Sequence, residues 1–243
     1  MQFNKKTQMW ESPYFHPAVT TDAVVLGFDG EALNVLLIKR GLEPYKGMWA
    51  LPGGFLKQDD LSAYDCVNRE LREETNIEVN YLEELKTFSE INRDTRERVI
   101  TIAFFALVDQ SRYKVIGGDD AVDAQWFSVN DLPKLAFDHE KIVATALETL
   151  RRQIHFEPIG FYLLNKLFTM PELQNIYLAI LDPDEADMKL RDRRNFVKKM
   201  LKLGYIRDTG KKQTGNPYRS PKLYTFDAEV YAYAKKIGMR LEF

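Results

Sequence analysis

The spacing of apolar residues changes along the chain, and each change predicts a different kind of element. Residues 23–28 and 33–40 are runs of aliphatic residues on either side of Asp-Gly-Glu-Ala, which predicts two strands joined by a turn. Residues 61–76 place apolar side chains at nearly helical intervals and end at Asn76, which accepts the left-handed conformation of a helix cap. We therefore predict an amphipathic helix after the hairpin.

More strands are predicted beyond this helix. Residues 82–92 and 98–108 have the composition of strands, and residues 124–133 that of a strand, a turn and the start of a helix. Strands with interspersed helices predict an α+β fold for this part of the chain.

The pattern then becomes mainly helical. A long helix is predicted at residues 139–154, and two more at 168–181 and 188–206, the last with Gly204 as its C-terminal cap. Residues 207–226 predict a strand, a tip rich in Gly, Pro and Asn, and a returning strand. Helix, helix and hairpin in this order predict a winged helix-turn-helix.

The distribution of charge supports two domains. The 243 residues are 45% hydrophobic, as in globular proteins, and carry a formal net charge of −2. This charge is divided unevenly, because residues 1–150 carry −9 and residues 151–243 carry +7. We predict domains with these bounds and expect the second to favour a polyanion.

Other features of the composition indicate a cytoplasmic location. The single cysteine, Cys66, has no partner for an internal disulfide, and no apolar run is long enough to cross a bilayer. Residues 1–15 lack the apolar segment of a signal peptide. We therefore expect a reducing environment and no membrane partner.

A cluster of glutamates on the first predicted helix suggests a metal site. Glu70, Glu73 and Glu74 lie at helical spacing, so we predict that their carboxylates converge. Such a cluster repels itself unless a cation neutralises it, and its hard oxygen ligands suit Mg²⁺ or Mn²⁺. Gly53 and Gly54, just before the helix, would allow a close approach of the backbone to a ligand.

The same glutamates have a simpler interpretation. Glutamate is a good helix former, and Arg69 and Arg72 could pair with the cluster on a solvated helix face.

The neighbouring sequence favours the metal site. Trp-Ala-Leu-Pro-Gly-Gly-Phe at residues 49–55, followed by Arg-Glu-Leu-Arg-Glu-Glu-Thr at 69–75, resembles the Nudix box. This resemblance implies an α/β/α sandwich and a hydrolase that attacks a diphosphate with metal-activated water. It also implies roles for four residues: three metal ligands, Glu70, Glu73 and Glu74, and an arginine that positions one of them, Arg69.

The motif departs from the family pattern in two places. Asn76 stands where the family has glycine, which is a mild change because both residues accept left-handed geometry. Leu61 stands where the family has an upstream glutamate. Asp59 or Asp60 would replace that glutamate if the loop holds a one-residue insertion.

A Nudix hydrolase also needs a base or a further ligand from a later loop. Asp119 and Asp120 lie in Gly-Gly-Asp-Asp, at the place along the chain where such a residue is often found. Such a stretch is more often simply a turn.

The chain as a whole, from about residue 20 to its end, resembles the Nudix-related transcriptional regulators, in which a Nudix-like sensor domain precedes a DNA-binding domain. Members of this family sense ADP-ribose or a pentose, and most have a damaged Nudix helix, whereas this helix is intact. The resemblance implies a homodimer, because two recognition helices meet a palindromic site.

The basic residues of the second domain are candidate contacts to double-stranded DNA. Phe196, Met200 and Leu203 are spaced to face the core, which leaves the basic residues of their helix for the major groove and those of the wing for phosphates. The candidates are Lys189, Arg191, Arg193, Arg194 and Lys198 on the helix and Lys211, Lys212 and Arg219 on the wing. The alternative is a basic helix in a dimerisation or substrate-capping domain.

Candidate ligand-binding residues lie near the expected pocket. Arg40 ends a strand there, and Arg93, Arg96 and Arg98 could either reach ligand phosphates or protect a strand edge. We selected Arg40, Gly53, Gly54, Arg93 and Arg98 as the candidates. The Asp-His pair at 138–139 either caps a helix or belongs to the pattern of the regulators.

Two functions therefore compete. The first is a transcriptional regulator whose Nudix domain binds ADP-ribose or a related nucleotide or sugar. The second is a Mg²⁺-dependent ADP-ribose or nucleoside-diphosphate-sugar pyrophosphohydrolase, supported by Arg69, Glu70, Glu73 and Glu74.

Overall fold

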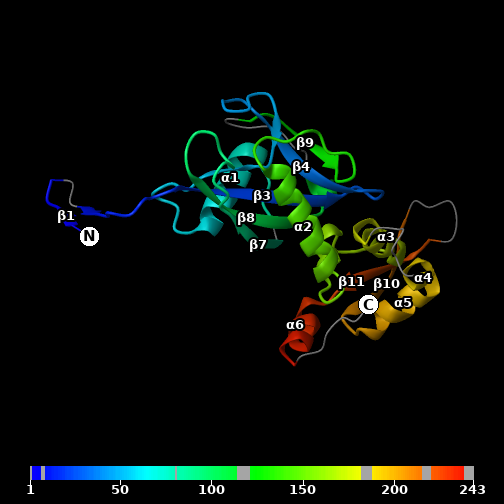
Figure 1. The fold of residues 1–243 in the computed structure, drawn as a ribbon. Helices are drawn as coiled ribbons and strands as arrows, with labels where there is room; N and C mark the ends of the chain where they lie inside the picture. The colour runs from blue at the N-terminus through cyan, green and yellow to red at the C-terminus, as the bar shows by residue number, and fades with distance from the viewer. Residues whose placement is uncertain are drawn as a thin grey trace.

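The computed structural model describes two joined parts, a mixed sheet between helices and a smaller helical part that carries a hairpin (Figure 1). The described residues are 2–6, 9–79, 81–113, 121–181, 188–214 and 220–237.

The first part is built on a seven-stranded sheet. Five of its strands lie in the order β5-β4-β3-β8-β7, while β6 pairs with β3 and β9 pairs with β4. The central strands β3 and β8 run parallel over their length, and the other pairs are antiparallel. The bounds of the strands are β3 Ala18–Phe28, β4 Leu33–Arg40, β5 Trp49–Ala50, β6 Gly53–Phe55, β7 Tyr81–Phe88, β8 Val99–Val108 and β9 Ala121–Ser128.

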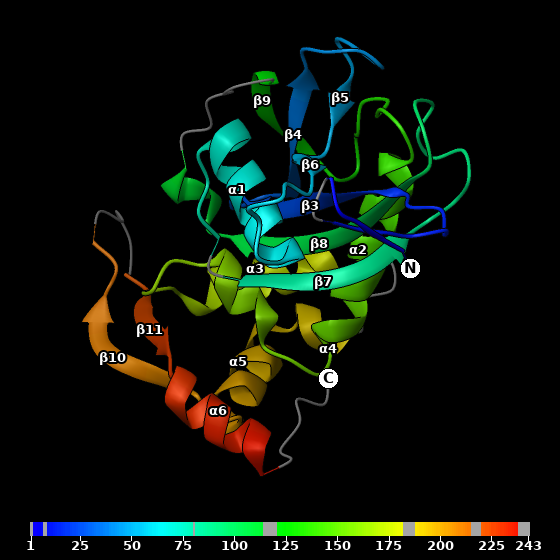
Figure 2. The ribbon, with the colours of Figure 1, turned by 90° about the vertical axis from the view of Figure 1, so that its left-hand side faces the viewer.

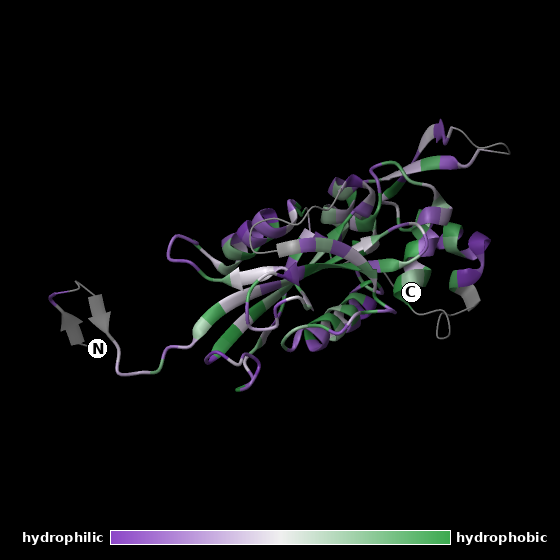
Figure 3. Cartoon of the chain, turned by 90° about the horizontal axis from the view of Figure 1, so that it is seen from above, coloured by the Kyte–Doolittle hydropathy of each residue, from purple (hydrophilic) through white to green (hydrophobic). Residues whose placement is uncertain are grey.

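Helices cover both faces of this sheet, as both ribbon views show (Figures 1 and 2). On one face, α1 (Ala63–Thr75) packs with one apolar cluster, and on the other, α2 (His139–Gln153) packs with a second. Green, hydrophobic segments run through the strands of the sheet in Figure 3, and β3 and β8 are largely buried, since helices cover both faces. This arrangement is the predicted α/β/α sandwich, and the fold class is confirmed.

The limits of α1 follow from its sequence. The Ser62 side chain accepts a hydrogen bond from the backbone N–H of Asp65 at the start of the helix. Asn76 closes the helix in the left-handed region, with φ 54°, as predicted from its tolerance of that conformation.

The second part has the predicted order of a winged helix. In α3 (Met170–Ile180), Thr169 and Glu172 form a capping box. The antiparallel strands β10 (Ile206–Lys212) and β11 (Lys222–Phe226) form the hairpin. The remaining elements are the helices α4 Met188–Arg191, α5 Arg193–Lys202 and α6 Ala228–Lys236, the 3-10 turns η1 Gln110–Arg112 and η2 Ile159–Leu163, and an N-terminal hairpin of β1 Gln2–Asn4 and β2 Met9–Glu11.

Two predicted elements were wrong in detail. The helix predicted over 188–206 is divided, because Asp192 is extended and caps α5 by accepting from the N–H of Asn195. The helix start predicted within 124–133 is absent, and the helix begins at His139. The intervening segment instead pairs with β5, where the N–H of Ala136 donates to the carbonyl of Trp49.

The two parts share one hydrophobic core. Buried residues of the sheet, of α2 and of the winged helix belong to the same apolar cluster. The helix α2 crosses residue 150, where the sequence predicted a domain boundary, and it therefore belongs to the packing of both parts. Among the described residues, no helix is long and apolar enough to span a membrane.

Candidate functional site

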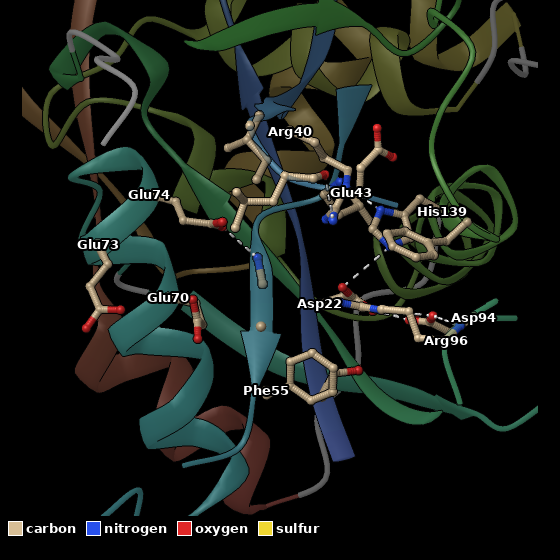
Figure 4. A pocket seen from close by; sticks show the side chains of 18 of the residues that line it. Asp22, Arg40, Glu43, Phe55, Glu70, Glu73, Glu74, Asp94, Arg96 and His139 are labelled. Atoms are coloured by element: carbon tan, nitrogen blue, oxygen red, sulfur yellow. Dashed lines mark hydrogen bonds and ion pairs between the residues drawn. The ribbon is translucent and has the colours of Figure 1, made fainter. Parts of the chain in front are cut away.

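A cavity of about 630 Å³ opens between β3, β6, α1 and the loop between β7 and β8 (Figure 4). Its wall combines glycines, carboxylates, arginines and two phenylalanines. The lining residues include Asp22, Arg40, Gly53, Gly54, Phe55, Lys57, Glu70, Glu73, Glu74, Arg93, Asp94, Arg96, Phe137 and His139.

The two glycines of β6 bring the backbone against both β3 and α1. A Cβ atom on Gly53 would lie 2.1 Å from the carbonyl oxygen of Thr21 on β3. A Cβ atom on Gly54 would lie 2.4 Å from Oε1 of Glu70 on α1. The absence of side chains therefore allows the carboxylates of α1 to approach the backbone of β6.

This packing predicts a large effect of Gly53→Ala. The new methyl group would overlap the backbone of β3, which cannot move without disturbing the central sheet, so we expect a loss of stability of about 1–3 kcal/mol or more. Urea-induced unfolding measures the change. Gly160→Ala is the control, because its Cβ would lie 3.3 Å from the nearest atom, and equal losses in both variants would contradict the packing argument.

Two glutamates of α1 face the cavity side of β6. Oε2 of Glu74 accepts the backbone N–H of Gly53 at 2.8 Å, and burial raises the pKa of Glu74 to about 8. Burial also raises the pKa of Glu70. Both carboxylates are thus in places where a charged form needs a compensating cation.

Arg69 is held by an aspartate of the preceding loop. Its guanidinium donates two hydrogen bonds to Asp60, at 2.9 and 2.8 Å, and a further one to Glu70 at 2.6 Å. The hydrogen bonds from Arg69 keep the pKa of Asp60 well below its usual range. Of the two aspartates proposed to replace the upstream glutamate, Asp60 is therefore the one that pairs with α1.

The predicted convergence of three glutamates is only partly present. Glu73 turns away from β6 and lies 3.1 Å from Arg69 and 3.6 Å from Lys57 (Figure 4). Within the described residues, no group of three or more His, Cys, Asp or Glu side chains is arranged to hold a metal ion. The carboxylate oxygens suit Mg²⁺ or Mn²⁺. However, Arg69 and Lys57 hold the third carboxylate, that of Glu73, away from the other two.

A buried ionic network underlies the floor of the cavity, which Asp22, Arg93 and His139 line. Arg93 donates to Asp22 on β3 at 3.3 Å and to both carboxylate oxygens of Asp138, at 2.8 and 3.2 Å. Nδ1 of His139 accepts the backbone N–H of Leu51 at 2.9 Å, and its Nε2 lies 3.6 Å from Asp22. Burial lowers the pKa of His139, so this imidazole is neutral and its Nε2–H faces Asp22.

Arginines and aromatic rings form the opposite wall. The guanidinium of Arg96 lies 5.1 Å from the ring centre of Phe55 and 5.8 Å from that of Phe137, and it pairs with Asp94 at 2.8 Å. The guanidinium of Arg40 lies 4.8 Å from the ring centre of Phe137. Cations beside aromatic faces can bind both the anionic and the planar parts of a nucleotide.

The structure brings together most of the predicted ligand-binding residues. Arg40, Gly53, Gly54 and Arg93 line the cavity, whereas Arg98 does not and Arg96 takes its place. The sequence contained all the arginines of this loop but no signal to choose among them, because its irregular backbone decides which of them faces inward.

Asp22 and the role of Asp138 were missed. A lone aspartate inside the apolar run of β3 was a usable signal, because a buried charge needs a partner. Asp138 does occupy the cap position of α2, but its side chain makes no capping hydrogen bond and pairs with Arg93 instead. Asp119 and Asp120 lie outside the described residues.

Two domain families match the chain. The NUDIX domain matches residues 16–146, and the NrtR DNA-binding winged helix domain matches residues 160–226. A protein named ADPR responsive transcriptional repressor NtrR, from Acinetobacter baylyi, is 30% identical over 93% of this chain and 88% of its own length. The chain belongs to the Nudix-related transcriptional regulators.

Solved structures support the same relationship for this Nudix-related regulator. Shewanella oneidensis NrtR complexed with a 27mer DNA has a TM-score of 0.76 and 29% identity, covering 88% of this chain and 95% of that one. The NUDIX domain of that protein complexed with ADP ribose has a TM-score of 0.53 and 33% identity, covering 58% of this chain and 94% of that one.

An enzyme matches the Nudix part alone. ADP-ribose pyrophosphatase from Methanocaldococcus jannaschii is 42% identical over 130 residues, which are 54% of this chain and 73% of that protein. The regulator domain and the hydrolase domain are therefore variants of one architecture.

The winged helix of the Nudix-related regulator presents the predicted basic surface. Phe196 and Met200 are buried in the core and Leu203 packs against it, which turns the other side of α5 outward. The candidates with exposed side chains are Arg191, Arg193, Arg194, Lys198, Lys211 and Lys212. The side chain of Lys189 and the whole of Arg219 lie outside the described residues.

Proposed function

We propose that this Nudix-related regulator binds ADP-ribose, or a closely related nucleotide or sugar, in the Nudix cavity and thereby changes its affinity for double-stranded DNA. The proposal rests chiefly on the cavity wall, where two arginines stand beside two phenylalanines and a glycine strand. The names of its relatives point the same way, since they include an ADPR responsive repressor and a NUDIX domain complexed with ADP ribose.

The chemistry of the cavity suits a nucleoside diphosphate sugar. Arg40 and Arg96 supply fixed positive charges for the diphosphate. Phe55 and Phe137 offer faces for a planar base. A volume of about 630 Å³ lies within the range of small-molecule sites.

The DNA-binding role is assigned to α5 and the wing. We assign base or phosphate contacts in the major groove to Arg191, Arg193, Arg194 and Lys198, with Lys189 at the start of the same region. Lys211, Lys212 and Arg219 on the wing are assigned to backbone phosphates. A homodimer in the cytoplasm would present two such helices to a palindromic site.

The test measures ligand binding and chemistry side by side. We expect calorimetry to show tight binding of ADP-ribose in EDTA, with no AMP or ribose 5-phosphate released when Mg²⁺ is added. A shift in DNA affinity on adding ADP-ribose completes the expected result. Failure to bind ADP-ribose would overturn the proposed ligand, and binding of a pentose instead would place the ligand among free sugars.

Hydrolysis is the second candidate function, because Arg69 and the three glutamates of the Nudix helix are all present. Glu70, Glu73 and Glu74 would hold the Mg²⁺ or Mn²⁺, once Glu73 leaves Arg69 and Lys57. The bound metal would supply an activated water for attack on the diphosphate.

Glu74→Gln separates the two functions. The amide keeps the shape of the side chain but removes the charge that a metal needs. If Mg²⁺-dependent release of AMP exists in the wild type, we expect it to vanish in this variant. The variant also has a readout without turnover, because any Mg²⁺-induced rise in melting temperature should be lost. Unchanged turnover would show that the cluster is not the metal site.

A further inference from the structure

We propose that Asp138 and Arg151, at opposite ends of α2, couple the Nudix cavity to the winged helix, with α2 moving as a rigid element between them. This inference rests on the proposed function, since it assigns a route for the effect of the ligand on DNA affinity. Neither side chain lines the cavity, so both act through other groups as positioning residues.

The first turn of α2 is attached to three segments of the cavity wall. Asp138 holds Arg93, which belongs to the loop between β7 and β8. His139 accepts the N–H of Leu51, just before the glycine strand, and faces Asp22 on β3. A change in any of these walls therefore acts on the start of α2.

Arg93 is the group through which an anionic ligand would act. Its side chain is 4% exposed, and its guanidinium is shared between Asp22 and Asp138, at 3.3 and 2.8 Å. It also lines the cavity, so a ligand phosphate would compete with both carboxylates for its N–H groups. Binding would thus weaken the attachment of Asp138, and the ligand would favour a position of α2 different from the one in the free protein.

The middle of α2 is tightly packed. Ile142, Val143, Ala146 and Leu150 are all 0–1% exposed, and they belong to the apolar cluster that includes the sheet and the winged helix. A core of this density transmits a displacement because it has little free volume in which to absorb one. A helix of 15 residues carries that displacement over about 22 Å.

The last turn of α2 contacts the winged helix directly. Nε of Arg151 donates to the carbonyl oxygen of Ile180, at the end of α3, at 3.2 Å. On the other side of this turn, Gln153 donates to Glu83 on β7 at 2.7 Å, which keeps the helix end beside the sheet. The helix α3 packs in turn against α5 through Tyr177 and Phe196, whose ring centres are 5.6 Å apart.

The test compares coupling ratios, defined as the DNA dissociation constant with saturating ADP-ribose divided by that without it. The DNA is a duplex that the wild-type protein selects from a random library. The variants are Asp138→Asn and Arg151→Gln, with Arg152→Gln as the control. Asp138→Asn removes no capping bond, because the Asp138 side chain makes none. Arg151 and Arg152 are both exposed, so neither change should unfold the chain.

We expect the wild type and Arg152→Gln to show the coupling of about 5- to 150-fold that is usual for allosteric proteins. Asp138→Asn and Arg151→Gln should each reduce it to about 2-fold or less. Asp138→Asn weakens the same attachment that the ligand weakens, so its DNA affinity in the absence of ligand should shift toward the ligand-bound value. Arg151→Gln leaves the cavity end of α2 intact, so its DNA affinity in the absence of ligand should stay unchanged. Reciprocity gives a second readout, since DNA must change the ADP-ribose affinity by the same factor in each protein.

The outcomes separate this inference from the proposed function. If ADP-ribose does not change the DNA affinity of the wild type, both the proposed function and the route through α2 are overturned. If the wild type responds and either Asp138→Asn or Arg151→Gln keeps the full coupling ratio, only the route through α2 is overturned.

Discussion

Replacing Arg193 and Arg194 together with alanine is expected to weaken specific DNA binding by about 100-fold or more, while leaving ADP-ribose affinity unchanged. Both side chains are exposed in the first turn of α5, next to the Asp192 cap. A recognition helix reads bases with its N-terminal residues, so this turn is the part that would reach base edges. Gel-shift titration of the selected duplex measures the effect.

The control for this prediction removes the same charge elsewhere. Lys86 and Lys134 are exposed on the Nudix domain and do not line the cavity. If Lys86→Ala with Lys134→Ala weakened binding as much, the effect would reflect net charge rather than a contact by α5. Normal binding by the arginine variant would remove the recognition-helix assignment altogether.

The second large effect is expected in the cavity. Arg40→Gln combined with Arg96→Gln removes two fixed positive charges from the wall assigned to the diphosphate. A hydrogen bond to a charged group contributes about 1.5–3 kcal/mol, so ADP-ribose affinity should fall by about 100-fold or more. Calorimetric titration measures the loss, with DNA binding in the absence of ligand as the internal control.

The choice of glutamine limits other causes of that loss. Its side chain keeps part of the contact that Arg96 makes with Phe55 and that Arg40 makes with Phe137. The exposed lysine pair used above serves again as the matched control. If the arginine variant kept the wild-type affinity for ADP-ribose, the diphosphate could not be assigned to this wall. Arg93 on the cavity floor would then be the remaining candidate.

The sequence determined the elements whose signal is local. The period of the apolar residues in 61–76 and the cap residue Asn76 were enough to place α1. The aliphatic runs around Asp-Gly-Glu-Ala gave the β3–β4 hairpin, and the order of helices and hairpin gave the winged helix. Local periodicity and capping act within a few residues, so they can be read without knowing the fold.

Side-chain contacts, some local and some tertiary, decided the details that the apolar pattern could not. Asp192 divides the predicted recognition helix because its side chain caps α5, a choice that competes with continuing the helix. Glu73 was predicted to join Glu70 and Glu74, but Arg69 and Lys57 hold it apart. Helical spacing fixes which side chains share a face, whereas the neighbouring charges fix where each one points.

Some residues of the cavity could be identified from the sequence, and others only from the structure. The sequence by itself determined the Nudix helix, the glycine strand and the basic winged helix, because each is a contiguous motif whose chemistry is visible in one segment. Only the tertiary structure joined Asp22, Arg93, Asp138 and His139, which come from three separate segments. Their meeting depends on the parallel pairing of β3 with β8 and on the docking of α2, which are long-range contacts without a local signal.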